Sequence, residues 1–309
     1  MFETLRRYEI NSKALKMIEY QMSGKGKRLR PAIVVSVCNT LGGNTADSFS
    51  LAIAIEIIHN ASLVHDDVED KDELRRDKYS LWKVFSEEQA INVGDLMFAL
   101  GLQIFMDSKL EEHRKFLIIR EINKSVIGIT NGQILDVDQK QNAIHDLDEY
   151  FEMIDGKTGA LFVLAFVGGG LTAKIPTHDE YLKLTSIGLT FGRLFQIRDD
   201  LIDALGLKEG RKAGRDIVEG KMSLPTVLAL EKLNKNEKAR LLEIHKMSCE
   251  LKNDELIKEA LALYDRADVF SDIRKMYSDY ETQLIKLSSF NSELSKFIDE
   301  LLKSLKINY

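Results

Sequence analysis

The segment Ser48–Asp70 reads SFSLAIAIEIIHNASLVHDDVED and decides the fold. Its first part is apolar on nearly every face of a helix, which is typical of a helix buried at the centre of a protein. We therefore expect a helix over Ala46–Asp70. The apolar run ends in the pattern D-D-x-x-D at residues 66–70, so a group of carboxylates closes a buried helix.

The rest of the chain also favours helices. Only three prolines occur, and proline breaks helix interiors, so their scarcity leaves room for many long helices. Nothing resembles regularly spaced short strands. Further helices are expected over the first twenty residues, 32–41, 82–105, 112–138, 148–170, 179–205 and the last eighty residues. The sequence predicts an all-α fold with one domain over residues 1–309.

Composition limits the partners and the compartment. The 309 residues carry a formal net charge of −6, so no broad basic surface for nucleic acid is expected. Cys38 and Cys249 have no metal-ligand spacing and indicate no disulfide framework. No apolar signal peptide opens the chain. The longest uncharged stretch, Thr158–Ala173, is shorter than the roughly 20 residues of a spanning helix. We expect a cytoplasmic protein without a transmembrane segment, and a buried helix at Thr158–Ala173 with an irregularity at Gly168–Gly170.

The D-D-x-x-D pattern occurs a second time, at residues 199–203, again after an apolar helical run. Residues four apart on a helix face the same way, and like charges at that spacing repel by roughly 0.2–0.5 kcal/mol. Carboxylate clusters suit Mg²⁺, which shares its coordination shell with substrate phosphates. A solvated acidic helix end is the alternative, but two copies favour metal binding. The candidate metal ligands are Asp66, Asp67, Asp70, Asp199, Asp200 and Asp203.

Positive side chains gather in the sequence near both acidic patterns. Guanidinium and ammonium groups match phosphate oxygens, and a helix starting near Pro31 would add free N–H groups. Taken singly, each cation reads as a solvated surface charge, whereas their concentration in an acidic protein favours anion binding. The candidates are Lys27, Arg30, Arg75, Arg76, Lys157 with Thr158, Arg211, Lys212 and Lys221.

Two uncharged candidates share helix faces with the acidic patterns. His59 lies two helical turns before Asp66. A lone histidine is usually structural, but this alignment favours a binding role. Gln196 precedes Asp199 by three positions and Asp200 by four, and its alternative role is a hydrogen bond in the core.

Together these segments resemble the trans-isoprenyl diphosphate synthases. The resemblance covers residues 24 to 225, and the order of its pieces is more specific than any one piece. The matching pieces are Gly26-Lys27-Arg28-Leu29-Arg30-Pro31, His59, the pattern at 66–70 with Arg75-Arg76, Lys157-Thr158, Phe195-Gln196-Ile197-Arg198-Asp199-Asp200 and Gly220-Lys221.

The resemblance implies an isoprenoid synthase fold, a helical bundle around a deep apolar cavity, and a homodimer. It implies that the six aspartates hold two to three Mg²⁺ ions against an allylic diphosphate (dimethylallyl, geranyl or farnesyl), with catalysis resting on Asp66, Asp70, Asp199 and Lys157. Isopentenyl diphosphate would be held by Lys27, Arg30, His59 and Arg76. The allylic diphosphate would be held by Arg75, Lys157, Thr158, Gln196 and Lys221.

One position departs from the family pattern. The family often has Gly-Lys where this chain has Gly210-Arg211. Arginine keeps the charge but changes the geometry, and the adjacent Lys212 is an alternative. Arg211 is therefore kept as a substrate-binding candidate.

The implied chemistry is head-to-tail condensation of isopentenyl diphosphate with the allylic substrate. The family sets product length largely by side-chain bulk before the first acidic pattern, where this chain has the small residues Ala61 and Ser62, with Ile58 one turn deeper. We expect geranylgeranyl diphosphate or a longer product. A terpene cyclase and a non-catalytic regulatory subunit are the alternatives. A cyclase leaves Lys27, Arg30 and Arg76 unexplained, and such a subunit has no need of two complete acidic patterns.

Overall fold

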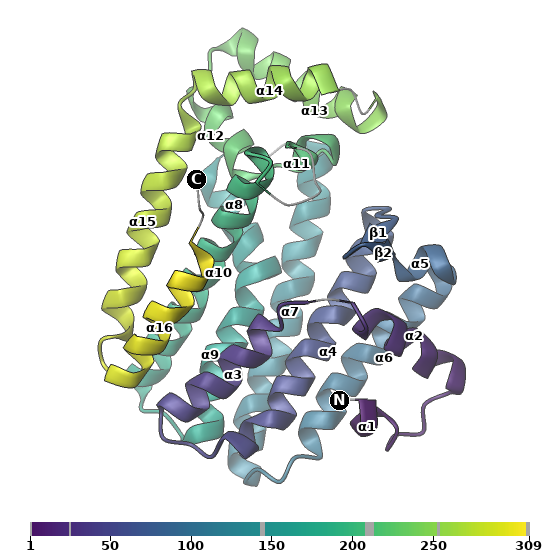
Figure 1. Ribbon diagram of the computed structural model, residues 1–309, viewed down its shortest axis with the longest axis vertical. Coiled ribbons are helices and arrows are strands. Elements are labelled where there is room, and N and C mark those ends of the chain that lie inside the picture. Colours follow the sequence, from purple (N-terminus) through teal and green to yellow (C-terminus); the bar gives the residue numbers. More distant parts are fainter. Residues whose placement is uncertain (1, 25, 143–145, 208–212, 252–253, 307–309) are drawn as a thin grey trace. The chain divides into compact units, whose positions relative to one another are not determined.

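The computed structural model describes residues 2–24, 26–142, 146–207, 213–251 and 254–306. These residues are almost entirely helical, which confirms the predicted all-α class (Figure 1). The helices are α1 (Phe2–Leu5), α2 (Ser12–Met22), α3 (Leu29–Thr40), α4 (Thr45–Glu69), α5 (Leu81–Val84), α6 (Glu87–Met106), α7 (Glu112–Asn142), α8 (Leu147–Ile154), the π-helical turn η1 (Asp155–Gly159), α9 (Ala160–Ala173), α10 (His178–Ala204), α11 (Arg215–Val218), α12 (Leu224–Lys232), α13 (Lys235–Leu251), α14 (Asp254–Arg266), α15 (Val269–Ser288) and α16 (Ser292–Leu305).

The chain forms two compact units. Unit 1 consists of Met1–Ile127 and Leu161–Gly188, and unit 2 consists of Gly128–Ala160 and Leu189–Tyr309. Each unit has its own buried apolar cluster. The organisation of residues 1–309 as one domain stays a prediction.

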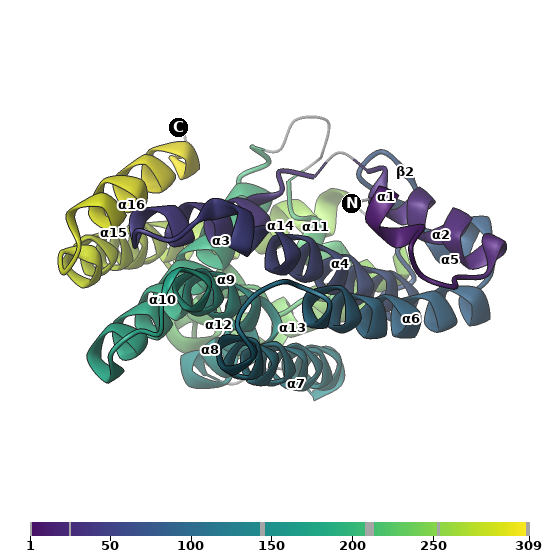
Figure 2. The same cartoon turned by 90° about the horizontal axis from the view of Figure 1, so that it is seen from below.

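The core of unit 1 is built on α4, which packs against α6, α3 and α2 (Figure 2). The apolar face predicted for α4 is buried as expected, and it meets apolar residues from both α2 and α6. This packing fixes the end of α4, where the first acidic pattern lies. Its buried cluster includes Met17, Ile18, Ile57, Ala61, Val64, Val93 and Met97.

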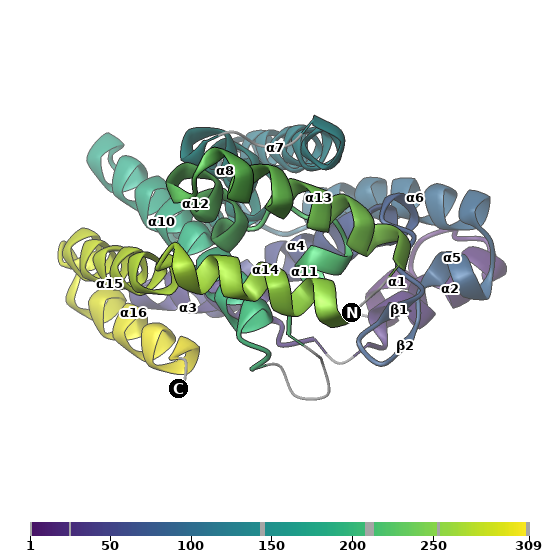
Figure 3. The ribbon, with the colours of Figure 1, turned by 90° about the horizontal axis from the view of Figure 1, so that it is seen from above.

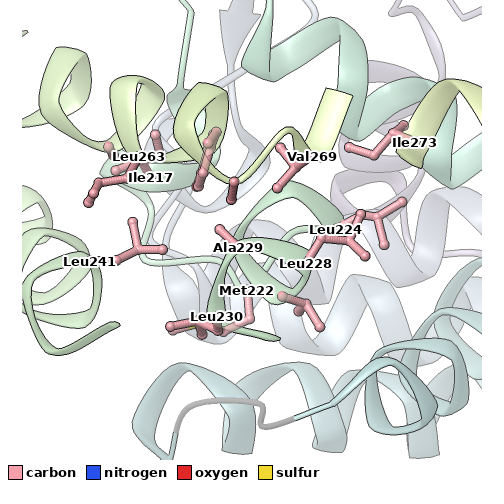
Figure 4. Close-up of a cluster of buried hydrophobic side chains, with 14 of the residues drawn as sticks. Ile217, Met222, Leu224, Leu228, Ala229, Leu230, Leu241, Leu263, Val269 and Ile273 are labelled. Atoms are coloured by element: carbon pink, nitrogen blue, oxygen red, sulfur yellow. The ribbon is translucent and has the colours of Figure 1, made fainter. Parts of the chain in front are cut away.

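The core of unit 2 surrounds the short helix α12, whose residues are buried from Leu224 to Leu230 (Figure 4). Helices α13 and α14 lie along one another, and α15 contacts both α12 and α14 (Figure 3). Pro225 lies in the first turn of α12, where its missing N–H costs no helical hydrogen bond. The predicted helix start at Pro225 is therefore confirmed.

The irregularity predicted at Gly168–Gly170 is wrong, because these glycines lie inside the regular helix α9. They serve close packing instead. A Cβ at Gly168 would lie 2.6 Å from Leu51 Cδ2, and one at Gly169 would lie 2.8 Å from the Val34 carbonyl oxygen. The irregularity comes earlier, at the π-helical turn η1, which begins at Asp155.

Local side-chain capping divides two of the predicted helices. The first twenty residues are two helices, because Asn11 accepts a hydrogen bond from the Lys13 backbone N–H and starts α2 there. The helix expected over 82–105 is divided in the same way, because Ser86 caps the start of α6. The linking segment also contains a hairpin that was not predicted, with β1 (Leu74–Arg75) antiparallel to β2 (Lys78–Tyr79).

Three segments among the described residues are long and apolar enough to cross a membrane, judged by length and composition alone. They are Thr45–Glu69, Glu87–Met106 and Leu147–Ala173, and 61%, 44% and 72% of their apolar windows are buried inside the protein. Most of the apolar window of the first segment and of the third is therefore buried in the protein's own core.

Candidate active site

The first acidic pattern ends α4, and its second aspartate is turned into the protein. Asp67 is 1% exposed and accepts a hydrogen bond from Arg75 Nε at 2.6 Å. Burial raises the pKa of Asp67 to about 6, although the neighbouring Arg75 acts in the opposite direction. Its other oxygen, Oδ2, is buried and accepts no hydrogen bond in the described structure. Arg75, predicted to contact substrate, is thus engaged with Asp67 and with Asp72.

Asp66 and Asp70 have a different environment from Asp67. They lie one helical turn apart at the end of α4, and both are half-buried. The Asp70 backbone N–H donates to the Asp66 carbonyl oxygen at 2.8 Å, so Asp70 caps the C-terminal end of α4. Helical geometry therefore divides the pattern into two partly accessible carboxylates and one buried carboxylate.

The hairpin after α4 places Arg76 in an unusual backbone conformation. Arg76 and Asp77 have φ values of 53° and 65°, and a tight turn between twisted strands requires this left-handed conformation at both central residues. Non-glycine residues adopt it at a cost, and such strain is typical of functional segments. The guanidinium of Arg76 packs against Gly26, where an added Cβ would lie 2.7 Å from Arg76 Nη1.

Arg30 and His59, both predicted to bind isopentenyl diphosphate, are neighbours in unit 1. Arg30 Nη1 lies 3.3 Å from His59 Nε2, and the Arg30 guanidinium stacks 4.5 Å from the Phe162 ring centre. Burial, reinforced by the positive charges of Arg30 and Arg76, holds the pKa of His59 well below its ordinary value. A neutral His59 accepts the Arg30 N–H through Nε2, so its proton is on Nδ1. Lys27 is exposed in the preceding loop.

Sequence reasoning missed the residues that hold this loop. Arg28 adopts a left-handed conformation at the start of α3, pairs with the buried Glu56 of α4, and donates to the Met22 carbonyl oxygen at 2.7 Å. Asn60 donates to the same carboxylate at 2.9 Å. A glutamate inside the apolar run of α4 was the available signal, because a buried charge requires a partner.

The second acidic pattern lies in α10, in unit 2, and its second aspartate is also buried. Asp200 is 4% exposed, and its carboxylate accepts three hydrogen bonds, each of 2.8 Å. The donors are the Tyr150 hydroxyl, Gln196 Nε2 and the Leu224 backbone N–H. Burial raises the pKa of Asp200 to about 6, opposed by these donors. Gln196 thus makes a hydrogen bond within the protein, and its contact with the allylic diphosphate stays a prediction.

Asp199 and Asp203 occupy the more accessible face of α10. The Asp199 side chain is 38% exposed and lies 3.6 Å from Arg198 Nη1. Asp203 Oδ2 accepts the Asp216 backbone N–H at 3.0 Å. The carboxyl of Asp216 was not predicted as part of the site. Burial, together with the negative charges of Asp203 and Asp200, raises its pKa well above the ordinary value.

The π-helical turn carries Lys157 and Thr158, also in unit 2. Lys157 Nζ pairs with Asp136 Oδ2 of α7 at 2.7 Å, and the Thr158 hydroxyl donates to Gln196 Oε1 at 2.8 Å. Hydrogen bonds thus run from Thr158 through Gln196 to Asp200. Asp136 was missed because its partner lies 21 residues away on another element.

Glycines allow α7 to approach this turn closely. A Cβ at Gly132 would lie 2.7 Å from the Gly156 carbonyl carbon, and one at Gly156 would lie 2.7 Å from the Gly128 carbonyl oxygen. Such short separations do not occur between real side chains and backbone. Lys157 therefore lies where α7 and the π-helical turn pack backbone against backbone, with no room for a side chain at Gly132 or Gly156.

The three predicted anion-binding residues of the loop after α10 have different outcomes. Lys221 Nζ pairs with Glu219 Oε2 at 2.6 Å, so its charge is already partly neutralised. Arg211 and Lys212 lie outside the described residues.

No three His, Cys, Asp or Glu side chains in the described ranges are grouped in a way that would hold a metal ion. Asp67 and Asp200 instead accept hydrogen bonds from protein groups. This arrangement turns each of them away from the neighbouring aspartates of its own pattern, which would repel it. The chemistry of the donors still fits Mg²⁺, because pairs of accessible carboxylates lie one turn apart and Asp67 keeps a buried oxygen that accepts no hydrogen bond.

A predominantly helical chain, with an aspartate-rich pattern at the end of α4 and of α10 and cations beside each, has the features that the resemblance to prenyltransferases implies. The sequence model of the family described as polyprenyl synthetase matches residues 11–264. The chain belongs to this family.

Similar proteins agree with this assignment. The chain is 32% identical over 262 residues to the short chain isoprenyl diphosphate synthase of Methanothermobacter thermautotrophicus, covering 82% of this chain and 76% of that protein. The structure resembles geranylgeranyl pyrophosphate synthetase from Pyrococcus horikoshii, with a TM-score of 0.87 and 28% identity over 96% of this chain and 90% of that one. It also resembles a Caulobacter crescentus polyprenyl synthase complexed with calcium and isoprenyl diphosphate, with a TM-score of 0.84 and 25% identity over 97% and 90%.

Proposed function

We propose that this prenyltransferase condenses isopentenyl diphosphate with an allylic prenyl diphosphate, head to tail, and releases a trans product of geranylgeranyl length or longer. The observation that carries this proposal is the cationic group of unit 1, in which Arg30 contacts His59 and the charge of Arg76 also acts on that imidazole. A cyclase binds only one diphosphate and has no use for this second group. Both aspartate patterns are complete, which a non-catalytic subunit does not need.

We assign the allylic diphosphate to the residues near the second pattern and on the π-helical turn. Lys157 supplies an ammonium whose partner Asp136 holds it in place, and Thr158 supplies a hydroxyl fixed by Gln196. A diphosphate would compete with the Asp136 carboxylate for the Lys157 ammonium. Lys221 and Arg211 are further candidates for the same anion.

Two to three Mg²⁺ ions are proposed as the cofactor. Asp66 and Asp70 would hold metal at the first pattern, with Asp67 Oδ2 as a further candidate ligand, and Asp199 and Asp203 would hold metal at the second pattern. The buried Asp200 holds the start of α12 in place through the Leu224 backbone N–H. When bound, Mg²⁺ stabilises the negative charge that builds on the departing diphosphate. The side chains that assist are Lys157 and Thr158, which reach the same anion.

The isopentenyl diphosphate site is assigned to Lys27, Arg30, His59 and Arg76. A neutral His59 donates from Nδ1 and adds no positive charge, so Arg30 and Arg76 carry the charge that attracts the diphosphate. Arg28 and Glu56 keep the loop in place beneath them. Each substrate is thus assigned to a cationic group of its own, the isopentenyl diphosphate to unit 1 and the allylic diphosphate to unit 2.

A homodimer in the cytoplasm is the proposed working state. Helix α7 exposes Phe116 and Ile127, which are 59% and 61% exposed and lie three turns apart on one face. These exposed side chains are available to a protein partner, and a second copy of the chain is the partner that the family resemblance implies. Sedimentation velocity of the purified protein checks the dimer.

A product assay tests the proposed function. Purified protein with Mg²⁺, labelled isopentenyl diphosphate and farnesyl diphosphate is expected to move label into an alcohol of 20 or more carbons after dephosphorylation. If folded protein moves no label into a chain longer than the primer, with any of the allylic primers, the result would contradict the proposal and support a cyclase or a regulatory subunit.

Ala61→Phe is expected to shorten the product. Ala61 is fully buried in the unit 1 cluster, one and a half turns before the first pattern, and a phenyl ring there would occupy space beside α4 that a growing chain needs. Overpacking is expected to cost about 1–3 kcal/mol of stability, so the melting temperature is measured with product length.

Ala52→Phe is the matched control for Ala61→Phe. Ala52 is buried on the opposite face of α4, nine residues earlier, so its phenyl ring overpacks the core without lying on the same face. Its product length is expected to equal that of the wild type. Equal product length for Ala61→Phe and wild type would show that Ala61 does not limit the chain.

A further inference from the structure

The π-helical turn Asp155–Gly159 is held by contacts with other elements. A π-helical turn inside an α-helical run is rare and is found mostly at functional sites, because its widened hydrogen-bond pattern needs support. Two of its residues, Lys157 and Thr158, make the contacts with Asp136 and Gln196 described above. The first residue of the turn, Asp155, has a partner of its own.

That partner is Arg193 of α10. Arg193 Nε donates to Asp155 Oδ1 at 2.7 Å and Nη2 donates to Oδ2 at 2.5 Å. A two-bond pair between guanidinium and carboxylate fixes orientation as well as distance. Both side chains are mostly buried, at 28% and 23% exposed, so water competes weakly for them.

Other elements of unit 2 fix the Arg193 guanidinium in turn. It lies 4.8 Å from the ring centre of Phe151 on α8, and Nη1 donates to the Tyr280 hydroxyl of α15 at 3.5 Å. The rings of Phe151 and Tyr280 are in edge contact, with centres 6.3 Å apart. The guanidinium is thus enclosed by α8, the turn and α15.

We propose that Arg193 is a positioning residue for the allylic diphosphate: its two-bond ion pair with Asp155 holds the π-helical turn in the register at which Lys157 and Thr158 reach that substrate. This inference rests on the proposed function of these two residues. Without the pair, the turn relaxes toward regular α-helix, and a change of one residue in register rotates Lys157 by about 100° around the helix axis. Neither Asp155 nor Arg193 contacts the predicted metal ligands in the described structure.

Arg193→Met and Arg193→Lys test this role. The methionine variant is expected to raise KM for the allylic diphosphate about tenfold, while KM for isopentenyl diphosphate changes less than about twofold, because misplacement by 1 Å is enough for such losses. The lysine variant is expected to raise the allylic KM about threefold, since an ammonium keeps the charge but cannot make the two-bond contact.

A matched control exists in the same unit. Arg240 makes the same two-bond pair with Glu259, with both distances 2.7 Å, between α13 and α14. Arg240→Met removes a two-bond ion pair of the same geometry away from the turn, with partners that are 38% and 43% exposed, and both KM values are expected to stay within about twofold of wild type. Thermal unfolding of each variant separates loss of stability from loss of positioning.

The outcomes separate failure of the inference from failure of the proposed function. If Arg193→Met raises both KM values equally, or leaves both unchanged as Arg240→Met does, the positioning role is overturned, while an active wild type keeps the proposed function.

If the wild type condenses no substrates, calorimetric binding of a non-ionisable allylic thiolodiphosphate replaces the measurement of KM. Weaker binding to Arg193→Met than to wild type then supports positioning, and equal or absent binding overturns it. Asp155→Asn, which keeps the side-chain volume, replaces Arg193→Met if the latter fails to fold.

Discussion

Asp66→Asn is expected to lower kcat/KM about a thousandfold, equivalent to roughly 4 kcal/mol of transition-state stabilisation. The amide oxygen is a weaker ligand for a hard cation than a carboxylate, and metal stabilisation of a leaving group is worth several kcal/mol. Asp66 is half-buried and its neighbour Asp67 makes the contact with Arg75, so the fold is expected to remain. The rate of label transfer, measured over a series of Mg²⁺ concentrations, checks this result.

The control for Asp66→Asn is Asp179→Asn. The Asp179 side chain is 73% exposed in the first turn of α10 and pairs only with Lys183 among the contacts described, so its loss is expected to change activity less than twofold. Wild-type activity in Asp66→Asn with a normal melting temperature would remove Asp66 from the metal ligands. A Mg²⁺ requirement shifted to higher concentration would instead support the assignment.

Asp200→Ala is expected to lower the free energy of unfolding by about 3–5 kcal/mol, in addition to abolishing activity. The substitution leaves the Tyr150 hydroxyl, the Gln196 amide and the Leu224 backbone N–H without their acceptor in a buried position. Each buried donor left unsatisfied costs about 1–3 kcal/mol. Urea unfolding followed by circular dichroism measures the loss.

The adjacent Asp199→Ala is the matched comparison for Asp200→Ala. Asp199 is 38% exposed, so its removal is expected to change stability by less than about 0.5 kcal/mol. Its activity is expected to fall as far as that of Asp66→Asn. Equal unfolding free energies for the two alanine variants would refute the structural role given to Asp200.

Local sequence signals predicted the helices and the ends on which the site is built. The apolar run before residues 66–70 predicted α4, and Pro225 predicted the start of α12. Local signals also explain why two of the predicted helices are divided in the structure. Asn11 and Ser86 are ordinary capping residues that divide helices, and their side-chain hydrogen bonds outweigh the apolar periodicity on either side.

Contacts between distant residues could not be predicted in the same way. Arg28 meets Glu56, Lys157 meets Asp136, and Arg193 meets Asp155 across separations of 28, 21 and 38 residues. Helical periodicity gives the face on which a residue lies but not the element opposite it. The equal spacing of the aspartates likewise did not distinguish Asp67 and Asp200 from their neighbours, because that difference comes from packing.

The crossing of α7 with the π-helical turn limits how this protein can be re-engineered. At Gly132 and Gly156 even a methyl group would overlap backbone atoms of the opposing segment. Directed evolution toward other primers or chain lengths therefore gains nothing by randomising these two positions. Variation is better placed along α4 near Ala61, where substitution changes the packing of side chains rather than the course of the backbone.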